Sequence, residues 1–158
     1  FIEGLIAKAK GVIDAPPKVP SWAQYAQKFG APNVVEEVKA FLSDRVSACL
    51  EHGIPGERLL VDPGFGFGKS FNHNRSLILE LEKFKDLALP IMVGLSQKGF
   101  VGALLGDVER DREAGSAGLA LVAVQRGARV VRCHDVSITR DLIRSWERLQ
   151  QPDGVRAQ

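Results

Sequence analysis

Apolar residues recur at helical spacing in five stretches of the chain, with short continuous apolar runs between them. In the first stretch, valines and leucines repeat at i, i+3 and i+4, which predicts an amphipathic helix over residues 34–52. Asn33 is its expected N-cap and Gly53 its expected stop. The other expected helices cover residues 75–86, 99–105, 114–126 (ended by Gly127) and 138–150.

The continuous apolar runs predict three buried strands, near residues 59–62, 91–95 and 130–134. Runs of this kind that alternate with helices are typical of a parallel sheet covered by helices. The predicted fold class is therefore α/β. Residues 1–32 differ, because a possible helix at the start is followed by prolines that predict a long loop over residues 13–32. Residues 151–158 are expected to form a frayed tail.

Composition narrows the function classes. The 158 residues are 45% hydrophobic and 25% charged, which suits one modest domain with a real core. The net charge of +2 predicts no large basic face, and so no nucleic-acid partner. Cys49 and Cys133 fit neither a disulfide framework nor a metal-ligand spacing, which favours a reducing cytoplasm. No apolar run approaches the roughly 18 residues of a membrane span, so no membrane partner is expected.

Polar side chains follow each predicted strand at its carboxyl end. Asp62 ends the first strand, Ser96 and Lys98 follow the second, and Arg132 and His134 end the third. Active sites of parallel α/β sheets and barrels lie at that edge. Three such strand ends predict a site, with Arg132 and His134 on one strand face, suited to gripping a phosphate or pyrophosphate.

The stretch VDPGFGFGKS, residues 61–70, resembles a phosphate loop but fails both nucleotide motifs. Pro63 stands where the P-loop needs a glycine, and Lys69 stands where the dinucleotide fingerprint needs its third glycine. Its glycines would instead let the backbone approach a flat ligand, with Phe65 and Phe67 flanking it. Asp62 and Lys98 could hydrogen-bond a heterocycle from two sides.

Each of these residues also has a plainer interpretation. Asp62 could only cap the following turn, and Lys69 and Lys98 could be solvated surface charges. A histidine such as His134 is more often a core residue than a ligand group. Asp135 could orient His134, or could cap the next helix together with Ser137.

Four motifs resemble the dihydropteroate synthase family in order and spacing, over about residues 33–150. They are Leu-Leu-Val-Asp-Pro-Gly-Phe-Gly-Phe-Gly-Lys (59–69), Val-Gly-Leu-Ser-Gln-Lys (93–98), Ala-Gly-Ser-Ala (114–117) and Arg-Cys-His-Asp-Val (132–136). The resemblance implies the C-terminal portion of a (β/α)8 TIM-type barrel. It also implies a transferase of folate biosynthesis, which joins p-aminobenzoate to 6-hydroxymethyl-7,8-dihydropterin pyrophosphate with Mg²⁺ assisting, and which sulfonamides inhibit.

The resemblance also assigns residues to the substrates. Asp62 and Lys98 match the family's pterin-binding acid and lysine, and Phe67 matches the phenylalanine of the p-aminobenzoate pocket. Arg132 and His134 match the pyrophosphate-binding pair. Gly66 and Ser96 join the substrate-binding residues, and no metal ligand is expected in this chain.

Two departures from the family pattern lie beside Lys98. The family usually reads Ser-Arg-Lys-Ser where this chain has Ser96, Gln97, Lys98 and Gly99. Without this arginine and serine, the binding of p-aminobenzoate, and of the sulfonamides that mimic it, should be weaker.

Only three strands are visible, whereas a complete barrel takes about 250 residues. We therefore expect residues 1–158 to form a single, partial barrel domain, belonging to a longer protein or covering itself by association. Two alternatives are a non-catalytic remnant and a pterin-binding methyltransferase domain. A cytoplasmic homodimer through helices near 99–126 and 138–150 is expected, since small residues at 114–120 permit close helix approach.

Overall fold

The structure is a computed structural model, and it describes residues 33–107 and 109–151. The chain divides into two units, Phe1–Gly30 and Ala31–Gln158, and all described residues belong to the second. The expected helix and loop within residues 1–32, and the tail from residue 152 onward, lie outside the described residues. The description below concerns the second unit alone.

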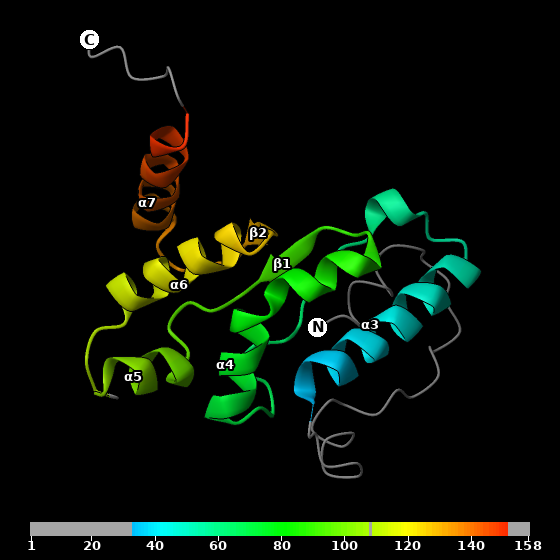
Figure 1. The fold of residues 1–158 in the computed structure, drawn as a ribbon, viewed down its shortest axis with the longest axis horizontal. Helices are drawn as coiled ribbons and strands as arrows, with labels where there is room; N and C mark the ends of the chain where they lie inside the picture. Colours follow the sequence, from blue (N-terminus) through cyan, green and yellow to red (C-terminus); the bar gives the residue numbers. More distant parts are fainter. Residues whose placement is uncertain (1–32, 108, 152–158) are drawn as a thin grey trace. The chain divides into compact units, whose positions relative to one another are not determined.

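The described part of the chain alternates helices with short strands (Figure 1). Helix α3 precedes a 3-10 turn, η1, and is followed by α4, a second 3-10 stretch η2, and strand β1. Helices α5 and α6 then lead to β2, and α7 closes the order. The bounds are α3 Val34–Glu51, η1 Gly56–Arg58, α4 Phe71–Leu79, η2 Leu81–Leu87, β1 Ile91–Val93, α5 Gly99–Leu105, α6 Glu113–Gln125, β2 Ala128–Val131 and α7 Val136–Leu149.

The helix ends follow from local chemistry. The Asn33 side chain accepts a hydrogen bond from the Glu36 N–H and caps α3, as predicted. Asp135 accepts from the Ile138 N–H at 2.7 Å, so of its two predicted roles the structure shows the helix cap. Gly127, with φ 104°, follows the end of α6 as expected.

The sheet is parallel, and the three predicted strands are shorter than expected or displaced. β1 pairs with β2, and the first run contributes only a bridge between Val61 and Ile91. The Val61 N–H donates to Pro90 at 2.9 Å, and the Val61 carbonyl accepts from Met92 at 2.8 Å. The strand expected over 59–62 shrinks to this one residue because η1 ends at Arg58 and a turn begins at Asp62. The 130–134 run is also corrected, since β2 ends at Val131.

The helix expected over 75–86 is two elements. Ser70 caps α4 by accepting from the His73 N–H, so α4 starts earlier than predicted, and Glu80 separates it from η2. Side chains from both elements enter the core. Each fully buried large apolar side chain contributes about 1.5–3 kcal/mol. The largest are Phe65, Phe84, Leu77, Leu81, Ile91, Val35, Val93 and Val101.

Helix α6 packs against α5, α7 and β2, while α3 packs against α4 and η2 (Figure 1). Ser116, Ala117, Ala120 and Ala123 of α6 are buried. These four small residues of α6 therefore pack within the unit. No helix in the described ranges is both long and apolar enough to cross a membrane.

Candidate functional site

The glycine-rich loop owes its shape to alternate residues in the left-handed region. Gly64, Gly66 and Gly68 have φ values of 72°, 76° and 60°, which residues with side chains rarely adopt. At Gly66 space is also limiting, because a Cβ there would lie 2.7 Å from Cδ of Lys98. The glycines therefore let the loop turn tightly and let the Lys98 side chain lie against its backbone.

The two phenylalanines of the loop separate into different roles. Phe65 is 1% exposed and belongs to the core, so the prediction that it flanks a ligand is wrong. Phe67 is 62% exposed. The Lys98 Nζ lies 3.9 Å from the centroid of the Phe67 ring and donates a hydrogen bond to the Phe65 carbonyl. The loop thus presents one open aromatic ring with an ammonium group over it.

Asp62 lies directly before this loop. Its Oδ1 accepts a hydrogen bond from the Gly64 N–H at 2.8 Å, so it does cap the turn, as the plainer interpretation expected. Burial lowers the pKa of Lys69 and of Lys98, and the Asp62 charge partly opposes that lowering at both lysines. The carboxylate therefore both shapes the loop and is the negative group among the cations of the site.

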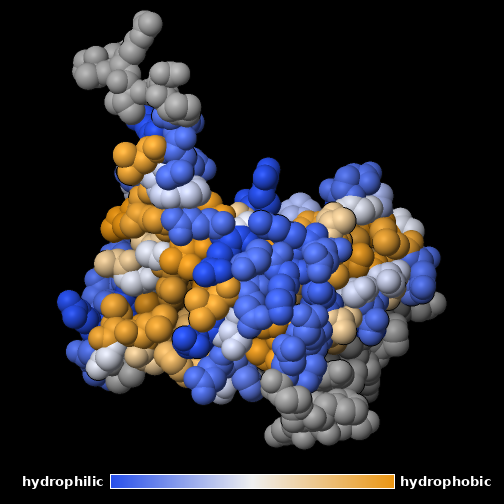
Figure 2. All heavy atoms as spheres, viewed as in Figure 1, coloured by the Kyte–Doolittle hydropathy of each residue, from blue (hydrophilic) through white to orange (hydrophobic). Residues whose placement is uncertain are grey.

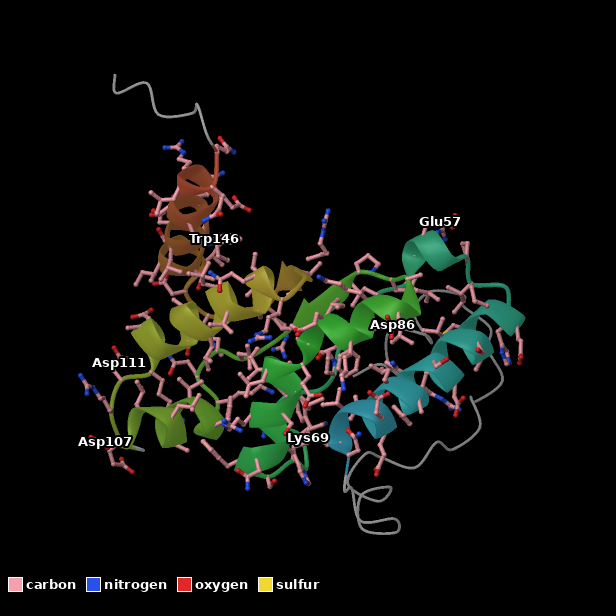
Figure 3. The ribbon with its side chains drawn as sticks, in the orientation of Figure 1. Glu57, Lys69, Asp86, Asp107, Asp111 and Trp146 are labelled. Atoms are coloured by element: carbon pink, nitrogen blue, oxygen red, sulfur yellow. The ribbon has the colours of Figure 1, made fainter. Side chains whose placement is uncertain are left out.

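Burial is the larger influence on those lysines. Burial lowers the pKa of Lys69 from 10.5 to about 8, and repulsion from Lys98 adds to this effect. Burial also lowers the pKa of Lys98, followed by repulsion from Arg132. The Lys69 Nζ donates to the Gly64 carbonyl at 2.9 Å, so it is built into the loop rather than being a solvated charge (Figure 3).

Arg132 and His134 were predicted to lie on the third strand, but they lie just beyond its end, because β2 ends at Val131. The Arg132 N–H still donates to the Val93 carbonyl at 2.9 Å, which continues the strand pairing by one bond. The Arg132 guanidinium lies over Gly94, where a Cβ would be 2.5 Å from Nη2. His134 Nδ1 lies 2.8 Å from the Ser96 hydroxyl. Both side chains are exposed and reach the segment that follows β1.

An open hollow of about 400 Å³ lies beside the loop. Lys69 and Lys98 give it two amino groups, and the rings of Phe71 and Phe100, 5.3 Å apart, give it aromatic walls. A Cβ added at Gly99 would meet nothing within 4 Å. Its lining residues are Gly66, Lys69, Phe71, Asn74, Lys98, Gly99, Phe100 and Ala103.

Sequence reasoning missed Asn74, which holds the loop from the first turn of α4. Its side chain is 2% exposed. It accepts from the Gly66 N–H at 2.8 Å and donates to the carbonyls of Lys69 at 3.2 Å and Ser70 at 2.8 Å. The cap at Ser70 was the missed signal, because a helix that begins at residue 71 places Asn74 beneath the loop.

Gln97 has a left-handed backbone, with φ 59°, although it is not glycine. Its N–H donates to the Ser116 hydroxyl at 3.0 Å, and its carbonyl accepts from Arg112 at 3.2 Å. These contacts from α6 and the residue before it fix the turn that carries Ser96 and Lys98. The Ala-Gly-Ser-Ala motif thus supports the site through its serine.

The described residues present no group of three or more His, Cys, Asp or Glu side chains that could hold a metal ion. The expected Mg²⁺ stays a prediction, and no chemical step below depends on it.

These features define an α/β protein whose sheet edge offers an exposed aromatic ring, a carboxylate and several cations. Residues 6–134 match the family model described as pterin binding enzyme, so the chain belongs to that family. The match begins at residue 6, and so it includes most of residues 1–32, where no motif of the family was predicted.

The relatives and solved structures agree with this assignment. The chain is 46% identical over 115 residues to dihydropteroate synthase of Haemophilus influenzae, covering 73% of this chain and 42% of that protein. It matches the structure of Xanthomonas albilineans dihydropteroate synthase with 4-aminobenzoic acid at 43% identity and a TM-score of 0.73, covering 77% of this chain and 46% of that one.

The same enzyme in complex with 7,8-dihydropteroate matches at 44% identity and a TM-score of 0.72, covering 75% and 46% of the two chains. This chain therefore spans less than half the length of these relatives. The predicted fold class, α/β and part of a TIM-type barrel, is confirmed by these structural matches.

Proposed function

We propose that this chain carries the pterin, p-aminobenzoate and pyrophosphate sites of a dihydropteroate synthase. The observation that carries the proposal is the convergence of the Lys98 ammonium, the open Phe67 ring and the Asp62 loop. Matched relatives bear that name, and the matched structures hold 4-aminobenzoic acid and 7,8-dihydropteroate. The reaction would condense 6-hydroxymethyl-7,8-dihydropterin pyrophosphate with p-aminobenzoate, giving 7,8-dihydropteroate and pyrophosphate.

The residues suit a reaction in which the leaving group departs before the amine attacks. When the carbon–oxygen bond to pyrophosphate breaks, the oxygen takes the electron pair and the methylene carbon gains positive charge, delocalised into the reduced pterin. The Asp62 carboxylate would stabilise that charge. Arg132 and His134 would bind the departing pyrophosphate. The aniline nitrogen then forms the new carbon–nitrogen bond and loses a proton to solvent, so no covalent nucleophile is needed.

The hollow beside the loop would receive p-aminobenzoate. Lys98 and Lys69 supply positive charge for the carboxylate, and the aromatic walls suit a flat ring. Gly99 leaves room where the family usually has serine, so the hydroxyl that would contact the carboxylate is missing. We therefore expect weak binding of p-aminobenzoate and of sulfonamides.

The test of the site is the substitution Asp62→Asn in the 158-residue chain. Asparagine caps a turn about as well as aspartate, so the loop should keep its shape. Loss of a charge-assisted hydrogen bond, worth about 1.5–3 kcal/mol, should weaken binding of the pterin pyrophosphate by roughly tenfold to a hundredfold in a calorimetric titration. Unchanged affinity would show that Asp62 is only a turn cap.

Product formation separates a catalyst from a non-catalytic remnant. The purified chain is incubated with both substrates and Mg²⁺, and 7,8-dihydropteroate is measured by chromatography. Binding of the pterin without product would favour the remnant. The exposed pair Arg132 and His134 is the observation that favours the synthase over a pterin-binding methyltransferase, since it provides donors for a pyrophosphate.

We also propose that the chain forms a homodimer through its last helices, α5, α6 and α7. Helices α5 and α7 carry exposed apolar side chains, and hydrophobic atoms gather over α5 and α6 in Figure 2. The exposed residues are Leu104, Leu105, Val136, Ile138 and Leu149. Sedimentation at micromolar concentration should give a dimer, and a clean monomer would contradict the proposal.

A further inference from the structure

Ser96 and His134 are joined by two contacts that involve a single hydroxyl oxygen. The backbone N–H of His134 donates to the Ser96 Oγ at 3.2 Å. The same Oγ lies 2.8 Å from Nδ1 of the His134 imidazole. Because the serine follows β1 and the histidine follows β2, these bonds tie together two segments that end at the same sheet edge.

Counting donors and acceptors gives the direction of the second bond. A serine hydroxyl has one hydrogen and two lone pairs, and a backbone N–H can only donate. The bond from the His134 N–H therefore occupies one lone pair of Oγ. Among the described residues, the hydroxyl hydrogen of Ser96 has no acceptor other than Nδ1. The arrangement that uses both groups has the Ser96 O–H donating to Nδ1.

We propose that Ser96 is a positioning residue that holds His134 in the tautomer with its proton on Nε2. An imidazole that accepts at Nδ1 must carry its proton on Nε2 when it is neutral. The outward nitrogen then donates a hydrogen bond, as an anion requires, rather than presenting a lone pair that would repel one. This inference rests on the proposed function, since it assigns His134 to an anionic group such as pyrophosphate.

The opposite tautomer would leave the site poorly matched to an anion. If Nδ1 carried the proton, Ser96 would accept two hydrogen bonds and its own hydrogen would have no described partner. Nε2 would then offer a lone pair close in sequence to the Arg132 guanidinium, which is a donor group. With the Ser96 contact, the neutral ring of His134 donates from Nε2, so that His134 and Arg132 both present donors to an anion.

The test is the ¹⁵N spectrum of the histidine rings in the labelled 158-residue chain. The chain has three histidines, so His134 is assigned by comparison with His134→Gln. The spectrum is recorded at about pH 8.5, because the protonated and bare nitrogens of a neutral imidazole differ in chemical shift. We expect Nε2 to carry the proton in the unaltered chain, and Ser96→Ala to give a mixture of tautomers.

Two further variants separate positioning from general structure. Ser96→Thr keeps the hydroxyl and should restore the Nε2–H signature. Ser145→Ala removes a hydroxyl that donates to the Asp141 carbonyl within α7, and it should leave His134 unchanged. A proton on Nδ1 in the unaltered chain would overturn the proposal. An unchanged His134 signature in Ser96→Ala would do the same.

A binding measurement distinguishes this inference from the proposed function. Inorganic pyrophosphate is titrated into the chain, and loss of one neutral hydrogen bond in Ser96→Ala should weaken its binding by about twofold to tenfold. Absence of pyrophosphate binding in the unaltered chain, with the Nε2–H signature intact, would contradict the proposed function and leave the tautomer assignment standing. Equal affinity of both chains would contradict the inferred role of Ser96.

Discussion

Lysines behave in opposite ways in two regions of this molecule. On the helix surface, hydrogen bonds to carboxylates raise the pKa of Lys39, through Asp86, and of Lys83, through Glu80. At the glycine-rich loop, burial lowers the pKa of Lys69 and of Lys98. In the first region carboxylates favour the charged lysines, and in the second burial opposes their charge.

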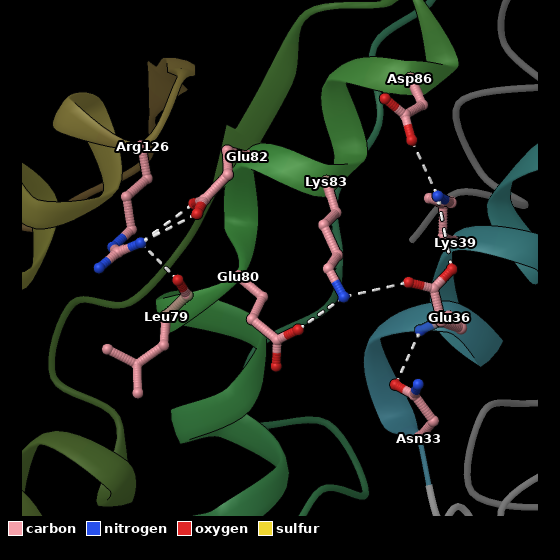
Figure 4. Close-up of polar contacts among 9 residues, drawn as sticks. All are labelled: Asn33, Glu36, Lys39, Leu79, Glu80, Glu82, Lys83, Asp86 and Arg126. Atoms are coloured by element: carbon pink, nitrogen blue, oxygen red, sulfur yellow. Dashed lines mark hydrogen bonds and ion pairs between the residues drawn. The ribbon is translucent and has the colours of Figure 1, made fainter.

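The first region is a set of ion pairs that links α3, α4, η2 and the end of α6, and we call it the helix-surface network (Figure 4). Lys39 lies 2.9 Å from Asp86, and Lys83 bridges Glu80 at 2.8 Å and Glu36 at 3.3 Å. Arg126 lies 3.1 Å from Glu82 and also donates to the Leu79 carbonyl. Solvent reaches these groups and screens their charges, so each pair contributes little to stability.

Two cations beside the glycine-rich loop are held differently. Within the described part of the chain, neither Lys98 nor Arg132 forms an ion pair with a carboxylate, and Lys98 donates to a backbone carbonyl instead. The Lys98 ammonium is part-buried and the Arg132 guanidinium is exposed, so both keep donor groups that an anionic ligand can use. The comparison therefore separates residues that stabilise the fold from residues that bind.

The largest expected effect is on stability, from the buried amide that holds the loop. Asn74→Leu removes three hydrogen bonds and leaves the Gly66 N–H unpaired, so the free energy of unfolding should fall by about 3 kcal/mol. Arg126→Leu, in the helix-surface network, should cost no more than about 1 kcal/mol. Urea denaturation of both variants measures the difference.

Asn72→Leu is the matched control for this prediction. Asn72 lies on the same helix, is exposed, and should change stability by less than about 0.5 kcal/mol. An Asn74→Leu variant as stable as Asn72→Leu would show that the loop does not depend on the buried amide. The stability of the fold would then not depend on the hydrogen bonds that hold the loop.

The second effect is on pyrophosphate binding, which we expect to depend on the loop region and not on the helix-surface network. Arg132→Leu should weaken pyrophosphate binding by roughly tenfold to a hundredfold, the equivalent of one charge-assisted hydrogen bond of about 1.5–3 kcal/mol. It should leave stability nearly unchanged, because the guanidinium is exposed and makes no ion pair among the described residues. Arg126→Leu should leave pyrophosphate affinity unchanged. Calorimetric titration measures the pyrophosphate affinity of both variants. Equal losses of affinity in Arg132→Leu and Arg126→Leu would contradict the comparison of the two regions.

Much of this site could be predicted from local pattern. The order of apolar runs and helices indicated the parallel sheet, and the polar residues after each run indicated the edge at which these side chains gather. Asp62 lies directly before the glycine-rich loop and Lys98 lies beyond β1, as expected, whereas Arg132 and His134 lie beyond β2 and not on it. Such features depend on neighbours in sequence, which periodicity reports directly.

What could not be predicted depends on contacts between distant segments. Apolar content does not reveal that Phe65 enters the core while Phe67, two residues later, is exposed. The burial of Lys69 depends on how the loop folds back on itself, and the Asn74 contacts depend on where α4 begins. Strand lengths were overestimated because an apolar run marks burial, whereas pairing requires a neighbouring backbone.

The smallest effect is the pH dependence of stability, in which the two regions have opposite signs. The folded-state pKa of Lys69, about 8, is below the ordinary value of 10.5, so the folded chain carries a penalty while this lysine is charged. That penalty is lost as pH rises from 8 to 10.5, and stability should increase by about 1 kcal/mol after allowance for solvent screening. Lys83 has a raised pKa, so its contribution is fully present below pH 10.5 and is lost as pH rises above it.

Unfolding free energies at pH 8 and pH 10.5 should therefore show an increase that Lys69→Met reduces and Lys83→Met does not. Lys98, whose pKa is also lowered, should supply the increase that is left in Lys69→Met. An equal increase in the unaltered chain and in Lys69→Met would show that Lys69 is not buried as a cation in the folded loop.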